Sequence, residues 1–399
     1  MASIPDFRFK SPFTPIQIFF ENITNIIGYD WLFGYTPSNL RRQQIVFVIF
    51  SGILMLNMTQ VKNALLDASS IGHLAINVIL FSAATYSCVV AVILAKYSKD
   101  FRFLIDWCGN LYTKKIDARI SHIRDDLFKE CAAQVYLFLR ATNYGYKSLI
   151  PIIFTFPLFM YLYDSTIMTP FPFHIPYLPH DYFPFYQFNY ISQLGGIYFA
   201  ACVTIIINSI LITMLIHAKY QLDFIDGSIK VIVNEAGTTF ELSEIEFMMK
   251  IVIDMHVDVL DVVKISSKIF SLQILSLNLM CYFLIGFTYI VVQIDKSSIY
   301  FTAVTCVNVL QLGFFSFLGA HLFYRLTDLS VGIYCTNWYN LGVKHQKTLQ
   351  MMMIRSQKSK ALSAAGFIDL SLISFLNLLS RSYSFCALVQ VILFEDEHI

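Results

Sequence analysis

The chain has 399 residues, of which 56% are hydrophobic and 14% are charged. A soluble domain is usually about 45–50% apolar and about 25% charged, so this composition excludes an ordinary soluble protein and predicts one that lipid surrounds. The formal net charge of +1 gives no strong field that would attract nucleic acid, and we expect no nucleic-acid partner.

Seven segments are long and apolar enough to cross a bilayer, since a spanning helix needs roughly 20 mostly apolar residues. The predicted fold class is therefore an all-α membrane protein with seven transmembrane helices. The third segment carries Pro151 and Pro157, which predict a kink or a part outside the bilayer. The segments are 43–62, 71–95, 132–163, 192–217, 269–293, 299–324 and 370–394.

Lys and Arg gather at one end of these segments. Of the 28 in the chain, 23 lie in the N-terminal arm 1–42 and the connections 96–131, 218–268 and 325–369, and two lie in the connections on the other side. Positive residues stay in the cytoplasm. We therefore expect a cytoplasmic N-terminus and, after seven crossings, an extracellular C-terminus with the short tail 395–399.

The connections differ in composition. The arm 1–42 is rich in proline and aromatic residues and is expected to lie along the inner membrane face. The outer connection 164–191 holds five of the 11 prolines, nine aromatic residues and no Lys or Arg. Proline removes a backbone donor and fixes φ, so no regular helix is expected there. This connection is interpreted either as a compact cap on helix ends or as a lid over a pocket.

Two cytoplasmic connections are predicted to be helical. The stretch 96–131 is expected to continue the second spanning helix. In 218–268, apolar residues recur every three or four positions, at Leu242, Ile245, Met249 and Val252, which predicts a helix that runs into the fifth spanning segment. Together with 325–369, this segment could anchor subunits in the cytoplasm.

Motifs for catalysis and for metal binding are absent from the sequence. No P-loop, GxGxxG, GxSxG or HExxH pattern occurs, so we expect no enzyme and no cofactor. The eight cysteines form no CxxC pair and no Cys/His cluster with metal spacing. We therefore expect no metal site and, since no cysteine falls in the outer connections, no external disulfide.

The final segment 370–394 has one polar face. Arg381 stands near its middle, and such a charge avoids lipid because it costs about 2.5–3.5 kcal/mol or more at the bilayer centre. Spacings of three and four residues predict a pore lining that narrows to a short apolar gate, with polar packing inside the chain's own bundle as the alternative. The face comprises Ser374, Asn377, Arg381, Ser384, Ala387, Gln390 and Val391, of which Ser384, Ala387, Gln390 and Val391 are the candidate pore and gate residues.

The C-terminal third resembles a known family. The stretches "IYCTNWYNL" (333–341), "IRSQKS" (354–359) and "LSLISFLNLLSRSYSFCALVQ" (370–390), with "MHVDVL" around His256, resemble the signature of insect odorant receptors. The resemblance implies an odorant-gated, non-selective cation channel with the final helix at the axis of a tetramer. The moderate loop before the fifth helix implies a tuning subunit, which pairs with a shared co-receptor in the plasma membrane of olfactory sensory neurons.

The resemblance also implies where a ligand binds. The family's pocket lies in the outer half of the membrane, among the second, third, fourth and sixth helices. A mostly apolar pocket with few polar groups would suit a small volatile molecule with one hydrogen-bonding group. The residues placed there by topology are His73, Asn77, Leu80, Phe81, Tyr146, Ile150, Phe154, Tyr198, Cys202, Tyr300, Phe301 and Thr305.

Two other classes of protein remain open at this point. A gustatory-type receptor channel would share the architecture but often assembles from one kind of subunit. A G-protein-coupled receptor has seven helices with an extracellular N-terminus, which the distribution of Lys and Arg opposes. The partners expected under the first reading are the co-receptor, a small volatile ligand, membrane lipid and the permeating cations.

Overall fold

A computed structural model describes most of the chain, and nearly all of the described part is helical. The tip of the N-terminal arm, most of the connection 164–191 and the last four residues lie outside it. The described residues are 11–27, 40–66, 68, 70–114, 116–164, 171, 184–235, 242–294, 299–358, 360, 362–364 and 366–395.

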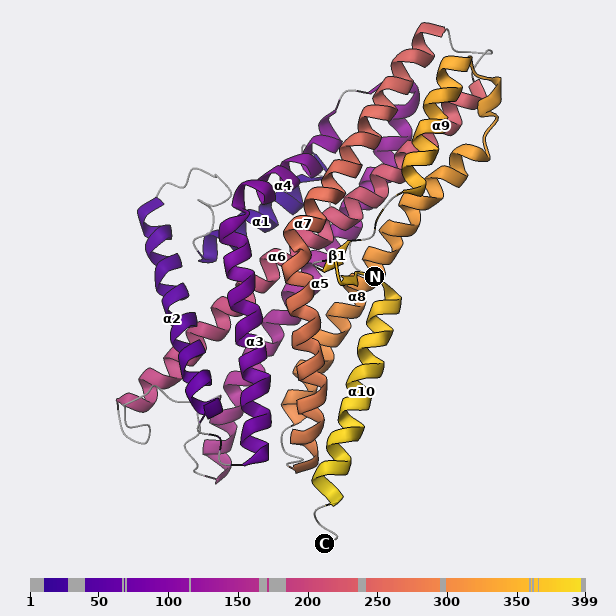
Figure 1. Cartoon of the computed structure of the whole chain (residues 1–399). Coiled ribbons are helices and arrows are strands. Elements are labelled where there is room, and N and C mark those ends of the chain that lie inside the picture. Colours follow the sequence, from indigo (N-terminus) through magenta and orange to yellow (C-terminus); the bar gives the residue numbers. More distant parts are fainter. Residues whose placement is uncertain are drawn as a thin grey trace.

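Helices α3 and α10 run upright in Figure 1, and α6 crosses the bundle obliquely from lower left to upper right. Each predicted spanning segment corresponds to a helix: in chain order α2, α3, α5, α6, α7, α8 and α10. The elements are α1 (Thr14–Ile27), α2 (Leu40–Leu66), α3 (Ile71–Lys96), α4 (Ser98–Thr113), α5 (Ala118–Asp164), α6 (Phe185–Glu235), α7 (Leu242–Ile294), α8 (Ile299–Tyr334), η1 (Trp338–Asn340), α9 (Val343–Gln357), β1 (Ser363–Ala364), β2 (Ile368–Asp369) and α10 (Leu372–Glu395).

The longest helices extend well beyond a bilayer. The 51 residues of α6 and the 53 residues of α7 far exceed the roughly 20 that span the hydrocarbon core. The apolar stripe in 218–268 therefore correctly predicted a helix that continues into the fifth spanning segment. The expected continuation of the second spanning helix through 96–131 is wrong, because α3 ends at Lys96 and Tyr97, with φ −106° and ψ 24°, separates it from α4.

Five helices of the described part are apolar enough over a sufficient length to cross a membrane: α3, α6, α7, α8 and α10. The other two predicted spans lie in α2 and α5, which are also helical and carry a few polar residues. Asn57, Gln60 and Lys62 lie in α2, and Arg140 and Lys147 lie in α5. A spanning helix accepts such residues where neighbouring helices cover them.

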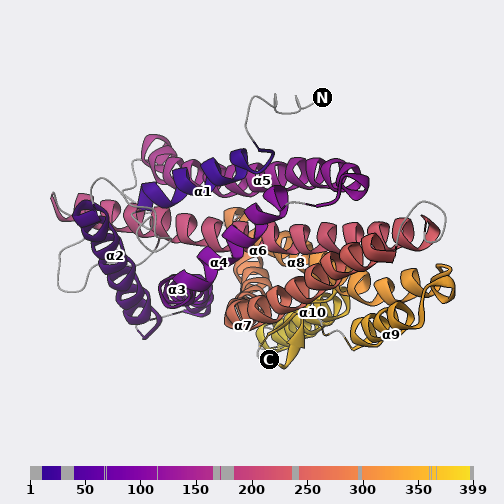
Figure 2. The same ribbon diagram turned by 90° about the horizontal axis from the view of Figure 1, so that it is seen from above.

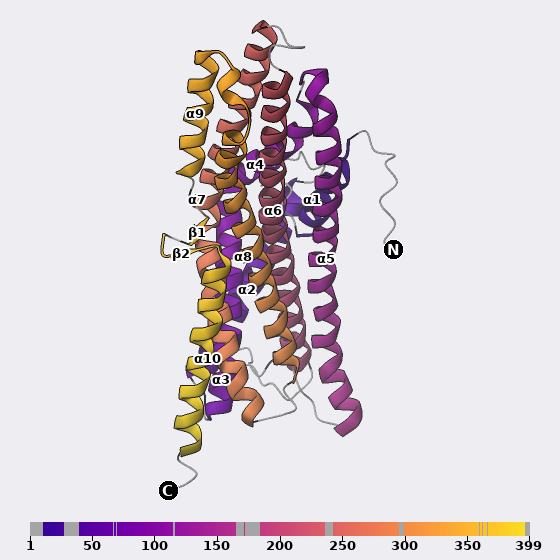
Figure 3. The same ribbon diagram turned by 90° about the vertical axis from the view of Figure 1, so that its right-hand side faces the viewer.

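Helix α6 lies at the centre of the bundle and α10 at its edge. In the apolar stretch of α6 that could span a membrane, 89% is buried, whereas in the corresponding stretch of α10 only 11% is buried. Figure 2 shows α6 between α5 on one side and α7 on the other, and Figure 3 shows α10 and α5 at opposite edges. The chain therefore organises its helices around α6 and leaves α10 largely uncovered.

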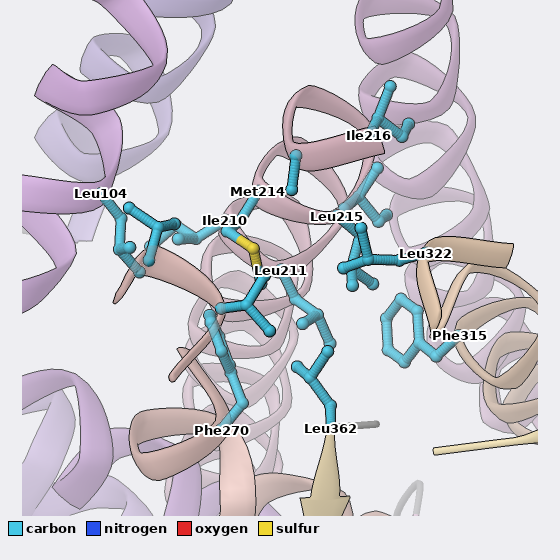
Figure 4. Packing of buried hydrophobic residues seen from close by; sticks show 14 of the residues in the cluster. Leu104, Ile210, Leu211, Met214, Leu215, Ile216, Phe270, Phe315, Leu322 and Leu362 are labelled. Carbon is cyan, nitrogen blue, oxygen red and sulfur yellow. The ribbon is translucent and has the colours of Figure 1, made fainter. Parts of the chain in front are cut away.

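Close packing around α6 forms the core. Leu211 and Leu215 of α6 are buried, and Phe270 of α7 and Phe315 of α8 pack from either side (Figure 4). Lipid tails are as apolar as leucine, so within the membrane van der Waals fit stabilises such contacts more than exclusion of water does. The sequence meets this need with a run of leucine, isoleucine and methionine on every face of α6.

A short hairpin leads into α10. Strand β1 pairs antiparallel with β2, with Ala364 opposite Ile368, and β1 packs against α7. Gly366 in the connecting turn has a φ of 77°, a conformation that glycine adopts without the steric penalty of a Cβ atom. The amide of Leu370 donates to the carbonyl of Leu362 over 2.7 Å, which closes the hairpin two residues before α10 begins.

Candidate functional site

A mostly apolar cavity of about 220 Å³ lies between six helices. Its walls come from α2, α3, α5, α6, α7 and α8, with Phe171 from the connection that follows α5. The polar groups on its wall are few, as is usual for small-molecule sites. The lining residues are Leu54, Asn57, Val61, Ile79, Leu80, Ala83, Ala84, Tyr86, Ser87, Tyr146, Ile150, Phe171, Gln193, Gly196, Ile197, Ala200, Ala201, Thr204, Met280, Leu284, Phe301, Val304 and Asn308.

A glycine brings α2 against α6 at the cavity wall. The Asn57 side chain donates to the carbonyl of Ser192 over 3.1 Å and accepts from the Ser192 hydroxyl over 3.4 Å. A Cβ atom on Gly196 would overlap the amide nitrogen of Asn57. Glycine at 196 therefore allows Asn57 to reach α6, and a small residue at such an interface lets two membrane helices approach closely.

Gln193 holds the chain segment at Phe171 against α6. Its side-chain oxygen accepts from the Phe171 amide over 3.0 Å, and its nitrogen donates to the Phe171 carbonyl over 3.3 Å. Gln193 is buried, so this paired contact is shielded from solvent. Phe171 is the part of the aromatic connection 165–183 that the structure describes, and it lines the cavity.

Four of the twelve predicted ligand-binding residues line the cavity: Leu80, Tyr146, Ile150 and Phe301. The side chains of Phe154 and Tyr300 lie outside the part of the chain whose side chains are described.

The remaining predicted residues lie elsewhere. The Asn77 side chain donates to the carbonyl of Ala64 over 2.8 Å, so it links α3 to α2. Thr305 hydrogen-bonds Thr288 over 2.8 Å and links α8 to α7. His73 is exposed at the start of α3, where its backbone amide donates to the Ser70 hydroxyl. The other three, Phe81, Tyr198 and Cys202, pack in or against the core.

Topology alone missed the walls that α2 and α7 contribute. Leu54 and Val61 come from α2, and Met280 and Leu284 come from α7. One signal was available in the sequence: Asn57 is an amide inside an apolar span, and such a residue turns toward other protein rather than toward lipid. The apolar residues of α2 and α7 carry no such signal.

A chain of hydrogen bonds crosses the bundle beside the cavity. Gln273 of α7 donates to the side-chain oxygen of Asn208 over 2.9 Å. The amide of Asn208 donates to the hydroxyl of Tyr146 over 3.5 Å, and this hydroxyl donates to the side-chain oxygen of Gln311 on α8. Four helices are thereby joined, and Tyr146 connects this chain to the cavity wall.

The polar face of α10 points out of the described bundle. Arg381, Asn377 and Ser384 line a groove of about 740 Å³ between α10, α7 and the hairpin. The four candidate pore and gate residues are all exposed, and Tyr289 of α7 donates to the side-chain oxygen of Gln390 over 2.7 Å. Gln390 thus packs against α7 of the chain's own bundle, while Arg381, Asn377 and Ser384 line the groove.

Outside the predicted spans, an ion pair ties α5 to α7. The Arg119 guanidinium holds both carboxylate oxygens of Glu244, at 2.5 and 3.1 Å. This carboxylate, with Asp117, raises the pKa of Arg119 above its ordinary value. Among the described residues, no group of three or more His, Cys, Asp or Glu side chains could hold a metal ion.

The fold has solved relatives. It resembles the insect olfactory receptor OR5 from Machilis hrabei in complex with eugenol, with a TM-score of 0.83 at 12% identity, covering 95% of this chain and 99% of that one. Another structure of that receptor gives a TM-score of 0.75 at the same identity and coverage. Together with the apolar helices, this likeness defines a multi-pass helical membrane protein.

The chain belongs to the family described as 7tm Odorant receptor, which matches residues 70–383. Members of this family are receptors and not enzymes. Odorant receptor 30a from Drosophila melanogaster is 31% identical over 74 residues, which are 18% of this chain and 20% of that protein. A second protein of the same fly is 23% identical over 224 residues, 55% of this chain and 54% of its own length. The chain therefore matches about a fifth of the length of Odorant receptor 30a and about half of the length of the second relative.

Proposed function

We propose that this odorant receptor is the ligand-binding tuning subunit of an odorant-gated, non-selective cation channel. In this proposal the chain assembles with a shared co-receptor as a heterotetramer in the plasma membrane of olfactory sensory neurons. The N-terminal arm 1–42 faces the cytoplasm and the tail 395–399 faces outward. The segments 218–268 and 325–369 form the cytoplasmic anchor, and the connection 164–191 covers the outer ends of the spanning helices 43–217.

The cavity is the observation that carries the ligand-binding part. Its volume of about 220 Å³ lies below the roughly 300–1,000 Å³ of sites for drug-sized ligands, so it favours a small volatile molecule. Leu80, Tyr146, Ile150 and Phe301 are proposed as ligand contacts. The receptor with the similar fold is described in complex with eugenol, which supports a ligand of that size class here.

The exposed polar face of α10 supports the channel part. Arg381 is charged and lies on an exposed face of an apolar helix, where lipid would oppose it. If several copies of α10 surrounded a common axis, this face would contact water instead of lipid. Ser384 would then line a wet vestibule, and Ala387 and Val391, with Gln390 beside them, would form the gate that closes by dewetting.

A cavity-filling substitution tests the proposal. Ala84 lines the cavity, and Ala84→Phe adds a ring that takes up a large part of its volume. In cells that also express the co-receptor, we expect the ligand concentration for half-maximal current to rise tenfold or more. Val92→Phe on the same helix is the control, since Val92 is 59% exposed and does not line the cavity.

The outcomes separate the competing classes. Surface expression of both variants, read by an epitope tag, must match that of the unmodified chain. If Ala84→Phe responds to ligand as the unmodified chain does, the ligand does not bind in this cavity. A current of full size without the co-receptor would favour the homomeric, gustatory-type channel instead.

A further inference from the structure

Helix α5 carries positive charge on a face that the neighbouring helices leave open. Arg140 and Lys147 are both exposed, although both lie in the predicted span 132–163. None of the ion pairs between described residues includes either side chain. A charged side chain of a membrane helix needs a partner or water, so these two cations call for a partner outside the described bundle.

Two tyrosines hold the Arg140 side chain from either side. The central carbon of its guanidinium lies 5.7 Å from the ring centroid of Tyr136 and 5.6 Å from that of Tyr144. The three residues follow one another at intervals of four, so they share one face of the helix. A guanidinium over a ring face keeps the N–H groups at its edge available to an acceptor.

Contacts between helices give the depth of Arg140. The ring of Phe138 on α5 packs against Phe314 of α8, with centroids 4.8 Å apart. The residue before it on α8 is Gly313, where a Cβ atom would lie 3.1 Å from the ring of Phe375. Phe375 belongs to the first turn of α10. Arg140, two residues after Phe138, is therefore level with the end of α10 at which that helix begins.

The beginning of α10 marks one surface of the bilayer. Its 24 residues rise by about 36 Å, a little more than the roughly 30 Å of the hydrocarbon core. Figure 3 shows α10 beginning level with the middle of α5, and Arg140 lies midway between Ala118 and Asp164. Arg140 thus lies near the lipid headgroups, on the side of the membrane where Lys and Arg gather.

Charge complementarity identifies the partner. From Cys131 to Tyr163 the sequence contains Arg140 and Lys147 but no Asp or Glu. The N–H fork of a guanidinium matches the oxygens of a phosphate group, and a net positive surface favours headgroups with a net negative charge. Helical side chains tilt toward the N-terminus of their helix, so Lys147 extends toward the same headgroup level.

The position of α5 in the bundle gives lipid access to this face. Helices α5 and α10 lie at opposite edges of the bundle (Figure 3). If α10 surrounds the axis of the channel, α5 is on the outside of the assembly and faces the bilayer, a step that rests on the proposed function.

We propose that Arg140, held between Tyr136 and Tyr144, binds the phosphate of an anionic phospholipid in the leaflet at which α10 begins. None of these three residues lines the ligand cavity, so the site is separate from it. A lipid that binds the folded chain and not the unfolded one stabilises the fold by mass action.

Thermal unfolding of the purified full chain in detergent provides the test. The probes are dioctanoyl phosphatidylserine, dioctanoyl phosphatidylcholine and inorganic phosphate. Phosphatidylserine is expected to raise the unfolding temperature at a concentration at least about threefold below that of phosphatidylcholine, the effect of the negative headgroup. Inorganic phosphate has no acyl chains to lie along α5 and is expected to give no protection at the same concentrations.

Substitutions assign the effect to Arg140. In Arg140→Gln, the half-maximal concentration of phosphatidylserine should rise about threefold to tenfold, the effect of one cation near a membrane surface. Arg140→Lys keeps the charge but loses the fork, and it should give a smaller rise. Lys129→Gln is the control, because it removes an exposed cation from the part of α5 before the predicted span, and it should leave this concentration unchanged.

Several outcomes overturn the inference. Equal protection by the two lipids in the unmodified chain does so, whether or not a variant folds. Protection by inorganic phosphate at the lipid concentrations would show an anion site that needs no lipid, and equal losses in Arg140→Gln and Lys129→Gln would show a general attraction between charges. A change of oligomer mass in Arg140→Gln, measured by light scattering, would make this face a contact with a second copy.

The test is independent of odorant-evoked current. If the chain binds no odorant or conducts no current, the protection by phosphatidylserine and its loss in Arg140→Gln are still measured on the purified protein. A failure of the proposed function is therefore distinguishable from a failure of the lipid site.

Discussion

Tyr289 of α7 donates a hydrogen bond to the side-chain oxygen of Gln390 on α10 over 2.7 Å. Gln390 lies next to Val391 on the exposed face of α10. Helix α7 also contributes Met280 and Leu284 to the cavity wall. One continuous helix thus contacts both the candidate ligand site and the candidate gate, which gives a direct physical route between them.

Removal of this bond should loosen α10. In Tyr289→Phe the ring remains and the hydroxyl is lost, so moving α10 away from α7 becomes easier. We expect the current without ligand to rise by about twofold to tenfold relative to the maximal current, the effect of one hydrogen bond. Whole-cell recording measures this ratio.

The control for this prediction lies on the same helix. Tyr282 packs its ring against Phe385 of α10, with ring centroids 5.8 Å apart. Tyr282→Phe keeps that ring contact and should leave the current without ligand unchanged. A basal current in Tyr289→Phe equal to or below that of the unmodified chain would show that the bond does not hold the gate.

Bulk at the proposed gate should block conduction. Ala387 and Val391 lie on the exposed face of α10, and tryptophan at either position would fill a narrow pore axis. We expect Ala387→Trp or Val391→Trp to reduce ligand-evoked current at least tenfold while surface assembly persists. Ala387→Ser, which keeps the side chain small, should retain the current. Unchanged conductance in both tryptophan variants would show that these residues do not form the gate.

The two neighbouring glycines of α6 should differ in their tolerance of a methyl group. A Cβ atom on Gly196 would overlap the amide nitrogen of Asn57, whereas one on Gly195 would meet the nearest atom of Ile53 at 3.4 Å. Gly196→Ala should therefore destabilise the protein by about 1–3 kcal/mol through overpacking, and it should weaken the ligand response. Thermal unfolding of purified protein in detergent measures the first effect.

Gly195→Ala supplies the matched comparison. Alanine favours the helix over glycine by about 0.8–1.0 kcal/mol, and the contact with Ile53 is at ordinary van der Waals distance. We expect its unfolding temperature to be equal to or slightly above that of the unmodified chain. If both alanine variants unfold at the same temperature, the close contact of α2 with α6 does not depend on Gly196.

The ion pair between Arg119 and Glu244 should depend on its geometry. Two parallel hydrogen bonds join the guanidinium to the carboxylate, and lysine, which presents a single ammonium group, cannot make both. Arg119→Glu should lower the unfolding temperature through like-charge repulsion, and Arg119→Lys should lower it less. Both side chains are more than a third exposed, so salt should reduce the effects.

A charge swap is the control for this pair. The double variant Arg119→Glu with Glu244→Arg places opposite charges at the same two positions. Its unfolding temperature should exceed that of Arg119→Glu alone and approach that of the unmodified chain. If the charge swap does not raise the unfolding temperature above that of Arg119→Glu, the arginine acts mainly through Asp117. Asp117 lies 3.3 Å from Arg119.

The sequence by itself determined the helices and the character of the last one. Backbone groups in lipid must bond within their own segment, so long apolar runs become helices whatever surrounds them, and each of the seven predicted spans coincides with one. Spacing of three and four residues placed Arg381 and Ser384 on one face, and both line the groove beside α10. The sequence contains no sign of the break between α3 and α4 at Tyr97, because the charge-mixed stretch after Tyr97 is also helical.

The tertiary structure decided which helix faces which, and therefore the site. Periodicity identifies a face of a helix but not the neighbour that covers it. Asn77 was expected at the ligand and instead donates to Ala64, whereas Met280 of α7 lines the cavity. The hydrogen bonds from Gln273 through Asn208 and Tyr146 to Gln311 join four helices, and they exist only once these helices are packed together.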